Sequence, residues 1–224
     1  MAAKIQALLL VLGALAAAAF NGATPRGPEA VDSRGVGCPA AAPPRTNGNS
    51  GRAAAIAAGG IVGPVRIDPR VDIGHVHLKV SNLDRALAFY RDLLGFDVTQ
   101  RLGDEAAFLS AGGYHHHIAL NTWESRGGSP PPPNTTGLYH VAIRYPDRRT
   151  LGGALRRLIE AKWPITGATD HGVSEAIYLR DPDGSGIELY RDRPEEEWPR
   201  PEAGEGVVMY SHPLDLRALL AEAG

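Results

Sequence analysis

The sequence has very few cysteines, and it has almost no net charge. Its 224 residues include one cysteine, Cys38, so a disulfide within the chain is excluded. The 23 Lys and Arg residues are balanced by 25 Asp and Glu residues, which gives a formal net charge of −2. Because nucleic-acid binding depends on a strong positive charge, we expect no nucleic-acid partner.

Aromatic residues are also scarce in the N-terminal third of the chain. Phe20 is the only aromatic residue before Phe89. A stretch with so little large apolar surface cannot offset the entropy lost on ordering. We therefore expect a disordered linker over residues 21–69, a folded domain over residues 70–200, and a C-terminal tail with a short helix over residues 201–224.

The longest apolar run lies at the N-terminus, between Ile5 and Phe20, directly after Lys4. A positive charge before an apolar run is typical of a secretory signal peptide. The run is shorter than the roughly 20 residues that a membrane-spanning helix needs. Residues 1–20 are interpreted as a signal peptide or as a leader without a role. Of these two interpretations the leader without a role is favoured, so we expect a cytoplasmic protein rather than an exported one. No membrane domain is expected.

Hydrophobic periodicity predicts the same order of elements twice, on either side of the Gly- and Pro-rich segment 127–136. Each half begins with a strand, continues with a helix and ends with three short strands. In the first half Asn82 is suited to cap the helix and Gly95 to end it. The expected strands are 73–80, 96–101, 106–110, 115–121, 138–145, 165–169, 175–180 and 187–190, and the expected helices are 82–94 and 147–162.

The first strands of the two halves carry matching histidines, in Gly74-His75-Val76 and Tyr139-His140-Val141. If the halves pack with pseudo-two-fold symmetry, these imidazoles come together, and Glu188 on the last strand faces the same cavity. Two imidazoles and one carboxylate suit Fe(II) and dioxygen chemistry, and with small changes other divalent ions.

Three segments, GHVHLKVSNLDRALAFYRDLLGF, LYHVAI and YLRDPDGSGIELY, resemble the vicinal oxygen chelate superfamily. This group includes glyoxalase I, bleomycin-resistance proteins, fosfomycin-resistance enzymes and extradiol dioxygenases. The resemblance covers residues 72–200. It implies an α+β fold in which two βαβββ modules, about 72–124 and 138–192, form a curved, mostly antiparallel sheet around a metal site. It also implies that His75, His140 and Glu188 are the metal ligands, with His77 a neighbour that is not a ligand.

Further residues resemble the catechol 2,3-dioxygenase type within that superfamily. Tyr178 lies ten residues before Glu188, as in that family, and His171 lies in a similar His-Gly segment. His116 matches the family's acid–base histidine, although a one-residue slip would select His115 or His117. The resemblance implies that His116 moves protons and that Tyr178 and His171 donate hydrogen bonds to developing negative charge.

The resemblance therefore predicts an extradiol ring-cleaving dioxygenase that uses Fe(II), or Mn(II) or another divalent ion, with a small aromatic substrate and dioxygen. A glyoxalase-type isomerase or a fosfomycin-type thiol transferase is the alternative within the superfamily. A metal-free small-molecule binding or resistance module is the alternative outside metalloenzymes. A homo-oligomer is compatible with the sequence.

We expect residues 1–69 to be dispensable for folding and turnover, because residues 1–20 are interpreted as a leader and residues 21–69 have few large apolar side chains. A protein that begins at Arg70 should melt cooperatively at nearly the temperature of the full chain. Differential scanning calorimetry of the two proteins measures this. A decrease of more than about 5 °C, which corresponds to roughly 1 kcal/mol, would contradict the expectation.

Overall fold

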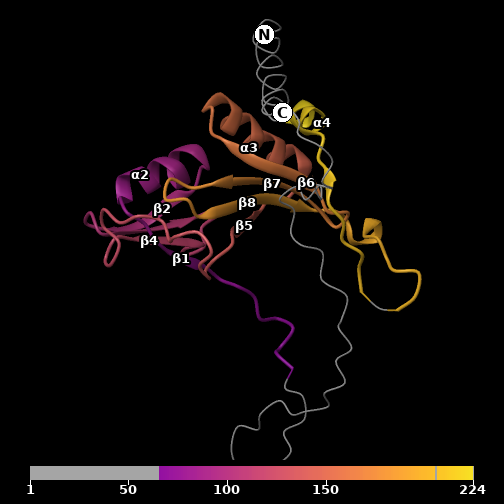
Figure 1. The fold of residues 1–224 in the computed structure, drawn as a ribbon, viewed down its shortest axis with the longest axis horizontal. Coiled ribbons are helices and arrows are strands. Elements are labelled where there is room, and N and C mark those ends of the chain that lie inside the picture. The colour runs from indigo at the N-terminus through magenta and orange to yellow at the C-terminus, as the bar shows by residue number, and fades with distance from the viewer. Residues whose placement is uncertain (1–65, 205, 224) are drawn as a thin grey trace, which may run out of the picture. The chain divides into compact units, whose positions relative to one another are not determined.

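The structure is a computed structural model that describes residues 66–204 and 206–223. The predictions for residues 1–65 lie outside the described residues. Two successive βαβββ units and a C-terminal extension make up the described chain (Figure 1). The α+β class and the two βαβββ units are thus confirmed.

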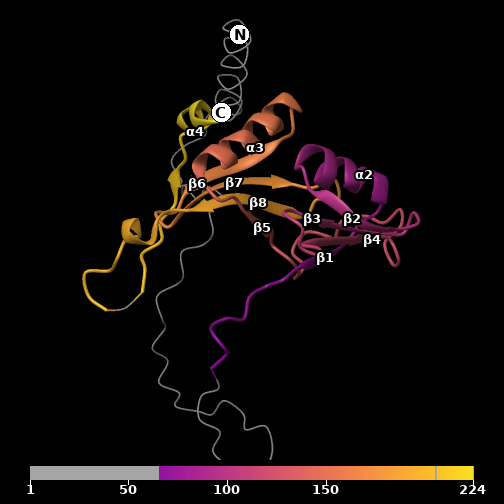
Figure 2. The ribbon, with the colours of Figure 1, turned by 180° about the vertical axis from the view of Figure 1, so that it is seen from behind.

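The strands form two sheets, of four and five strands (Figure 2). The first has the order β1-β4-β3-β2 and the second the order β5-β8-β7-β6-β9. In each unit the first and last strands pair in parallel, and the other pairs are antiparallel. The strands are β1 (Val76–Lys79), β2 (Asp97–Leu102), β3 (Ala106–Ser110), β4 (Ile118–Asn121), β5 (Val141–Arg144), β6 (Ile165–Asp170), β7 (Ser174–Arg180), β8 (Gly186–Asp192) and β9 (His212–Pro213).

The helix of the first unit differs from the single α-helix that the sequence predicts. It begins as α2 (Leu83–Leu87), where the Asn82 side chain accepts a hydrogen bond from the Arg85 N–H. It continues as the π-helix η1 (Ala88–Leu93), and Gly95 follows in the left-handed region with φ 92°. The wider turn brings neighbouring residues closer to one face of the helix. As a result, Phe89 and Tyr90 are both buried.

Helix α3 (Arg148–Glu160) of the second unit has the predicted form. Asp147 and Thr150 form a reciprocal capping box at its start. Leu151, Leu155 and Leu158 are fully buried on one side of the helix, as their spacing predicts.

The two units share one hydrophobic core, and polar contacts reinforce the join. The Phe89 ring lies 4.9 Å from the Trp163 ring. The buried Tyr90 hydroxyl donates to Asp181 Oδ2 at 2.9 Å, and the Ser81 hydroxyl donates to Asp183 Oδ1 at 2.6 Å. The Asp-Pro-Asp-Gly turn before β8 therefore fixes the start of the first unit's helix.

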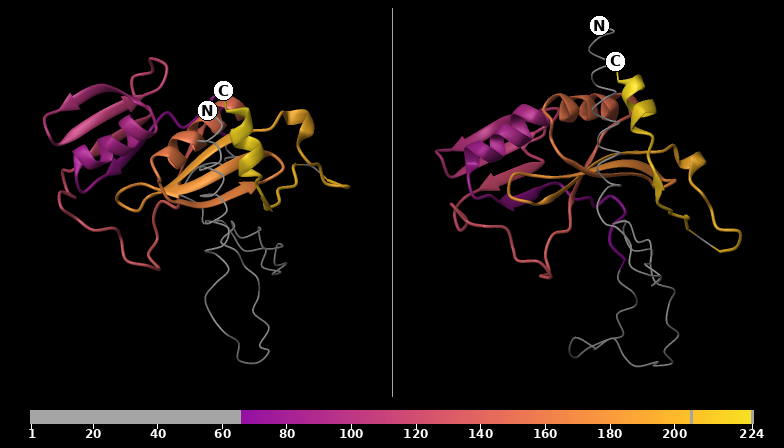
Figure 3. Two further views of the ribbon diagram at one scale, coloured as in Figure 1. Left: turned by 90° about the horizontal axis from the view of Figure 1, so that it is seen from above. Right: turned by 45° about the horizontal axis from the view of Figure 1, so that its top comes forward.

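The C-terminal extension packs onto the second unit. After the 3₁₀ turn η2 (Glu195–Glu197), β9 pairs with β6, and helix α4 (Leu216–Glu222) lies beside α3 (Figure 3). Leu219 of α4 is fully buried in the common core. A Cβ atom at Gly152 of α3 would lie only 2.6 Å from the Leu219 carbonyl oxygen, so the two helices approach closely at this glycine. Within the described residues, no helix is long and apolar enough to cross a membrane.

Substitutions of two adjacent glycines in α3 test the close packing of α4 against α3. Gly152→Ala should destabilise the protein, because the new methyl group collides with backbone and α4 must move. The cost should be about 1–3 kcal/mol, as for an overpacked core position. Gly153→Ala is the matched control, because its Cβ would meet only the end of the Arg157 side chain at 4.0 Å. That change should stabilise the helix by up to about 1 kcal/mol. Urea unfolding of both variants measures these changes, and equal shifts would contradict the close contact.

Candidate active site

Strand register brings the candidate catalytic residues of the second unit into one row. Glu188 on β8 pairs with Ala142 on β5 and with Tyr178 on β7, and Tyr178 pairs with Gly167 on β6. Paired residues on neighbouring strands share a face of the sheet. The ten-residue spacing between Tyr178 and Glu188 is thus the spacing of directly opposed residues in the β7–β8 hairpin.

His140 joins this row from the residue just before β5. Its Nε2 lies 2.9 Å from Glu188 Oε2. The approach of β5 to β8 requires a glycine at position 186, because a Cβ atom there would collide with the Tyr139 carbonyl oxygen and would lie 3.0 Å from the His140 Cβ. The absence of a side chain at Gly186 of β8 therefore makes room for His140, which precedes β5.

Hydrogen bonds connect the row to His171. The Tyr178 hydroxyl lies 3.0 Å from Glu188 Oε1 and 2.8 Å from His171 Nε2. Glu188 and His171 are buried, with exposed fractions of 9% and 7%. The structure thus brings together four of the predicted site residues, namely His140, His171, Tyr178 and Glu188.

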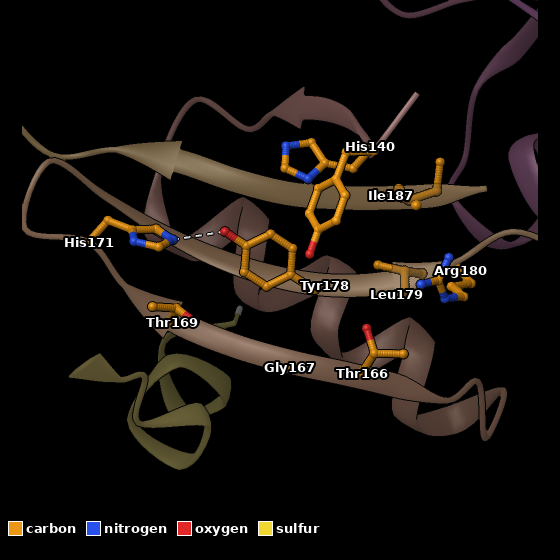
Figure 4. A pocket seen from close by; sticks show the side chains of 11 residues that line it. His140, Thr166, Gly167, Thr169, His171, Tyr178, Leu179, Arg180 and Ile187 are labelled. Carbon is orange, nitrogen blue, oxygen red and sulfur yellow. Dashed lines mark hydrogen bonds between the residues drawn. The ribbon is translucent and has the colours of Figure 1, made fainter. Parts of the chain in front are cut away.

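A pocket of about 280 Å³ lies over this face of the sheet, near the lower end of the size range of small-molecule sites. Figure 4 shows His140, Tyr178 and His171 at the pocket. The pocket is lined by Tyr139, His140, Thr166, Gly167, Thr169, His171, Tyr178, Leu179, Arg180, Gly186 and Ile187.

Sequence analysis did not identify Thr166, Thr169 or Arg180 as pocket residues. The register of β6 shifts between Ile165 and Gly167, so simple alternation does not tell which residues of this strand face the pocket. The run of small and polar residues in β6 was the one available signal.

The remaining predicted residues lie in the first unit. His75 immediately precedes β1, at the place that His140 has before β5. The His75 ring lies 4.4 Å from the His116 ring.

The two histidines that flank His116 have other partners. The His115 ring lies 4.1 Å from the Tyr114 ring, and His117 Nδ1 lies 3.2 Å from the Ser110 hydroxyl. Of the three consecutive histidines, His116 is therefore the one packed against His75. His77 Nε2 lies 2.8 Å from Asn121 Nδ2.

The surroundings of His116 favour its neutral form. Loss of hydration lowers the pKa of the His116 imidazole, and the nearby His75 and His115 imidazoles lower this pKa further.

The donor atoms beside the pocket fit part of a divalent-metal site. Two ligands that lie at right angles about 2.1 Å from an ion are about 3.0 Å apart. His140 Nε2 and Glu188 Oε2, which are 2.9 Å apart, match that separation. His140 Nδ1 is buried without a hydrogen-bond partner among the described residues. Over residues 66–204 and 206–223, no three His, Cys, Asp or Glu side chains lie close enough together to hold one ion. The structure therefore does not bring His75 together with His140 and Glu188.

Residues 72–189 match the family model for the Glyoxalase/Bleomycin resistance protein/Dioxygenase superfamily. The chain belongs to this superfamily. The match covers both βαβββ units and includes His75, His140 and Glu188, and it confirms the predicted superfamily.

The superfamily members most relevant to the site are curated dioxygenases. The chain is 45% identical over 152 residues to a catechol-2,3-dioxygenase from Bacillus subtilis, which covers 68% of this chain and 52% of that protein. It is 33% identical over 140 residues to biphenyl-2,3-diol 1,2-dioxygenase 3 from Rhodococcus globerulus, covering 58% and 68% of the two chains. The chain thus spans about half the length of the first relative. A solved glyoxalase/dioxygenase from Nostoc punctiforme is 21% identical with a TM-score of 0.49, covering 62% of this chain and all of that one.

Proposed function

We propose that this chain is an extradiol ring-cleaving dioxygenase that uses Fe(II) to cleave a catechol-like aromatic with dioxygen. The observation that carries the proposal is the row of Glu188, Tyr178 and His140, in which Glu188 is buried and the other two are half-buried, with His171 hydrogen-bonded to its end. The similarity to the Bacillus subtilis catechol-2,3-dioxygenase supports it. The small pocket over the row supports a small aromatic substrate.

His140 and Glu188 would hold the ion, and His75, which the structure does not bring together with them, is the proposed third ligand. Imidazole and carboxylate donors of this kind suit Fe(II) and also Mn(II). The bound ion would orient the diol and dioxygen next to each other and stabilise negative charge. Because His75 lies in the first unit, the proposed site draws on both units.

The other polar side chains would act on protons and on developing charge. Tyr178 lines the pocket, and its hydroxyl is the proposed hydrogen-bond partner of a phenolate oxygen. His116, with its lowered pKa and its ring against His75, is the proposed acid–base group. Glu188 and His171 are buried on the pocket side, which limits the access of water to the row.

The register of the first unit argues against the glyoxalase-type alternative. A glyoxalase-type site would need a further acidic ligand near the end of that unit. Glu188 pairs with Ala142, the second residue after His140. In the first unit the second residue after His75 is His77, and it pairs with Ala119 of β4. Glu124 lies beyond the end of β4 and forms an exposed ion pair with Lys79. The first unit therefore offers no carboxylate at the equivalent position.

The metal part of the proposal predicts that His140→Ala and Glu188→Gln lose bound iron. Loss of a residue that hydrogen-bonds a metal ligand lowers metal affinity by roughly 10- to 100-fold, so loss of a ligand itself should lower the iron affinity by more than that. Metal content after anaerobic loading and desalting measures the effect. His212→Ala is the control, because this exposed histidine of β9 is not a proposed ligand. A His140→Ala protein that retains one tightly bound iron per chain would refute the ligand assignment.

The chemical part predicts oxygen uptake and a yellow ring-fission product when the iron-loaded protein meets a catechol. Compared at equal iron content, Tyr178→Phe should lose turnover by roughly 10²–10³-fold, because the hydroxyl acts on charge that develops during the reaction. Tyr145→Phe is the matched control, because this tyrosine packs against the core.

An oxygen electrode and absorbance spectra at equal iron content measure both variants. No oxygen uptake by the iron-loaded wild type across a broad catechol panel would exclude the dioxygenase. Since a thiol transferase or an isomerase consumes no dioxygen, the same experiment separates these alternatives. Full activity of Tyr178→Phe would remove this tyrosine from the mechanism.

A further inference from the structure

The backbone of the C-terminal extension contacts the buried site histidine. His171 Nδ1 lies 2.8 Å from the carbonyl oxygen of Tyr210, and His171 Nε2 lies 2.8 Å from the Tyr178 hydroxyl. Both ring nitrogens are therefore engaged, one by a backbone group and one by a side chain of the pocket.

The contact with the carbonyl determines where the imidazole carries its proton. A carbonyl oxygen only accepts hydrogen bonds, so His171 Nδ1 must donate. If His171 is neutral, Nε2 has no proton, and the single Tyr178 hydroxyl proton is shared between His171 Nε2 at 2.8 Å and Glu188 Oε1 at 3.0 Å. If His171 is charged, Nε2 donates to Tyr178, whose own proton then points to Glu188. In both cases Nδ1 keeps its proton, and Nε2 is the nitrogen that faces the Tyr178 hydroxyl.

We propose that Tyr210 is a positioning residue of this site, whose backbone carbonyl holds His171 in the Nδ1–H form and so aims Nε2 at the Tyr178 hydroxyl. This assigns a role in the site to the extension beyond residue 200. It also changes the role of neutral His171 from a hydrogen-bond donor to an acceptor that orients Tyr178.

Several independent contacts hold the Tyr210 carbonyl in place. The Tyr210 N–H donates back to the His171 carbonyl at 3.3 Å. The Tyr210 ring covers Gly172, where a Cβ atom would lie 2.6 Å from the ring and where φ is 79°. The ring also stacks on His212 at 4.3 Å, and His212 pairs with Asp170 in the β9–β6 ladder.

The ring of Tyr210 is thus the removable part of this arrangement. Tyr210→Gly deletes the contact with Gly172 and the stacking on His212, and it loosens the backbone that carries the carbonyl. Met209→Gly is the matched control. It makes the same backbone change one residue earlier, at a side chain that is 63% exposed.

The tautomer of His171 can be measured without any assay of activity. Two-bond ¹H–¹⁵N correlation spectra of the ¹⁵N-labelled full chain, free of paramagnetic metal, distinguish imidazoles protonated at Nδ1 from those protonated at Nε2. The His171→Gln spectrum assigns the signal. We expect the Nδ1–H form in the wild type and in Met209→Gly, and a mixture containing the Nε2–H form in Tyr210→Gly. An Nε2–H signal for wild-type His171, or an unchanged tautomer in Tyr210→Gly, would overturn the proposal.

Turnover provides a second test, which rests on the proposed function. Tyr210→Gly should lower kcat about tenfold with little change in KM, which is less than the loss expected for Tyr178→Phe. In a His171→Gln background, Tyr210→Gly should have no further effect, because the residue acts only through His171. Equal losses in both backgrounds would contradict this role. If no catechol is cleaved, the proposed function fails, while the spectra still decide on the tautomer.

Discussion

The pairing of β8 with its two neighbours determines the candidate site. The row Ala142, Glu188, Tyr178 and Gly167 runs across four strands. The neighbouring row, Val141, Ile187, Leu179 and Ile165, packs in or against the core. Ile187 and Leu179 belong to the core. A slip of one residue would exchange the two faces, burying Glu188 among apolar side chains and exposing the core residues. Core packing therefore enforces the register on which the site depends.

The two βαβββ units are alike in topology but not in chemistry. In the row of the first unit, His77, Ala119, Phe108 and Gln100 occupy the places of Ala142, Glu188, Tyr178 and Gly167. The first unit therefore has an alanine in place of the carboxylate and a phenylalanine in place of the tyrosine. It retains the histidine before its first strand, and it adds His116 beside it. This division of groups makes the proposed mechanism a shared task of the two halves.

The sequence was sufficient to predict the repeated units and the four residues that the second unit brings together. Alternation and helical spacing are local properties, and the ten-residue interval between Tyr178 and Glu188 depends on one hairpin. Other features depend on contacts between distant segments. The π-helical turn in the first unit places both Phe89 and Tyr90 in the core, and the approach of α4 depends on Gly152. The contact from Tyr210 could not be predicted, because it is made by a backbone carbonyl that any residue carries.

The docking of the C-terminal helix connects this contact to the rest of the protein. Glu175 of β7 is buried, and its carboxylate pairs with Arg148, Arg191 and Arg193. Arg148 also pairs with Glu222 of α4, so the end of the chain is tied to the strand that carries Tyr178. Removing one partner of a buried ion pair is costly, because it leaves a charge unpaired in the interior. A chain that ended at residue 200 would lose Glu222, the buried Leu219 and the Tyr210 carbonyl together. Stability and the orientation of His171 therefore depend on the same segment.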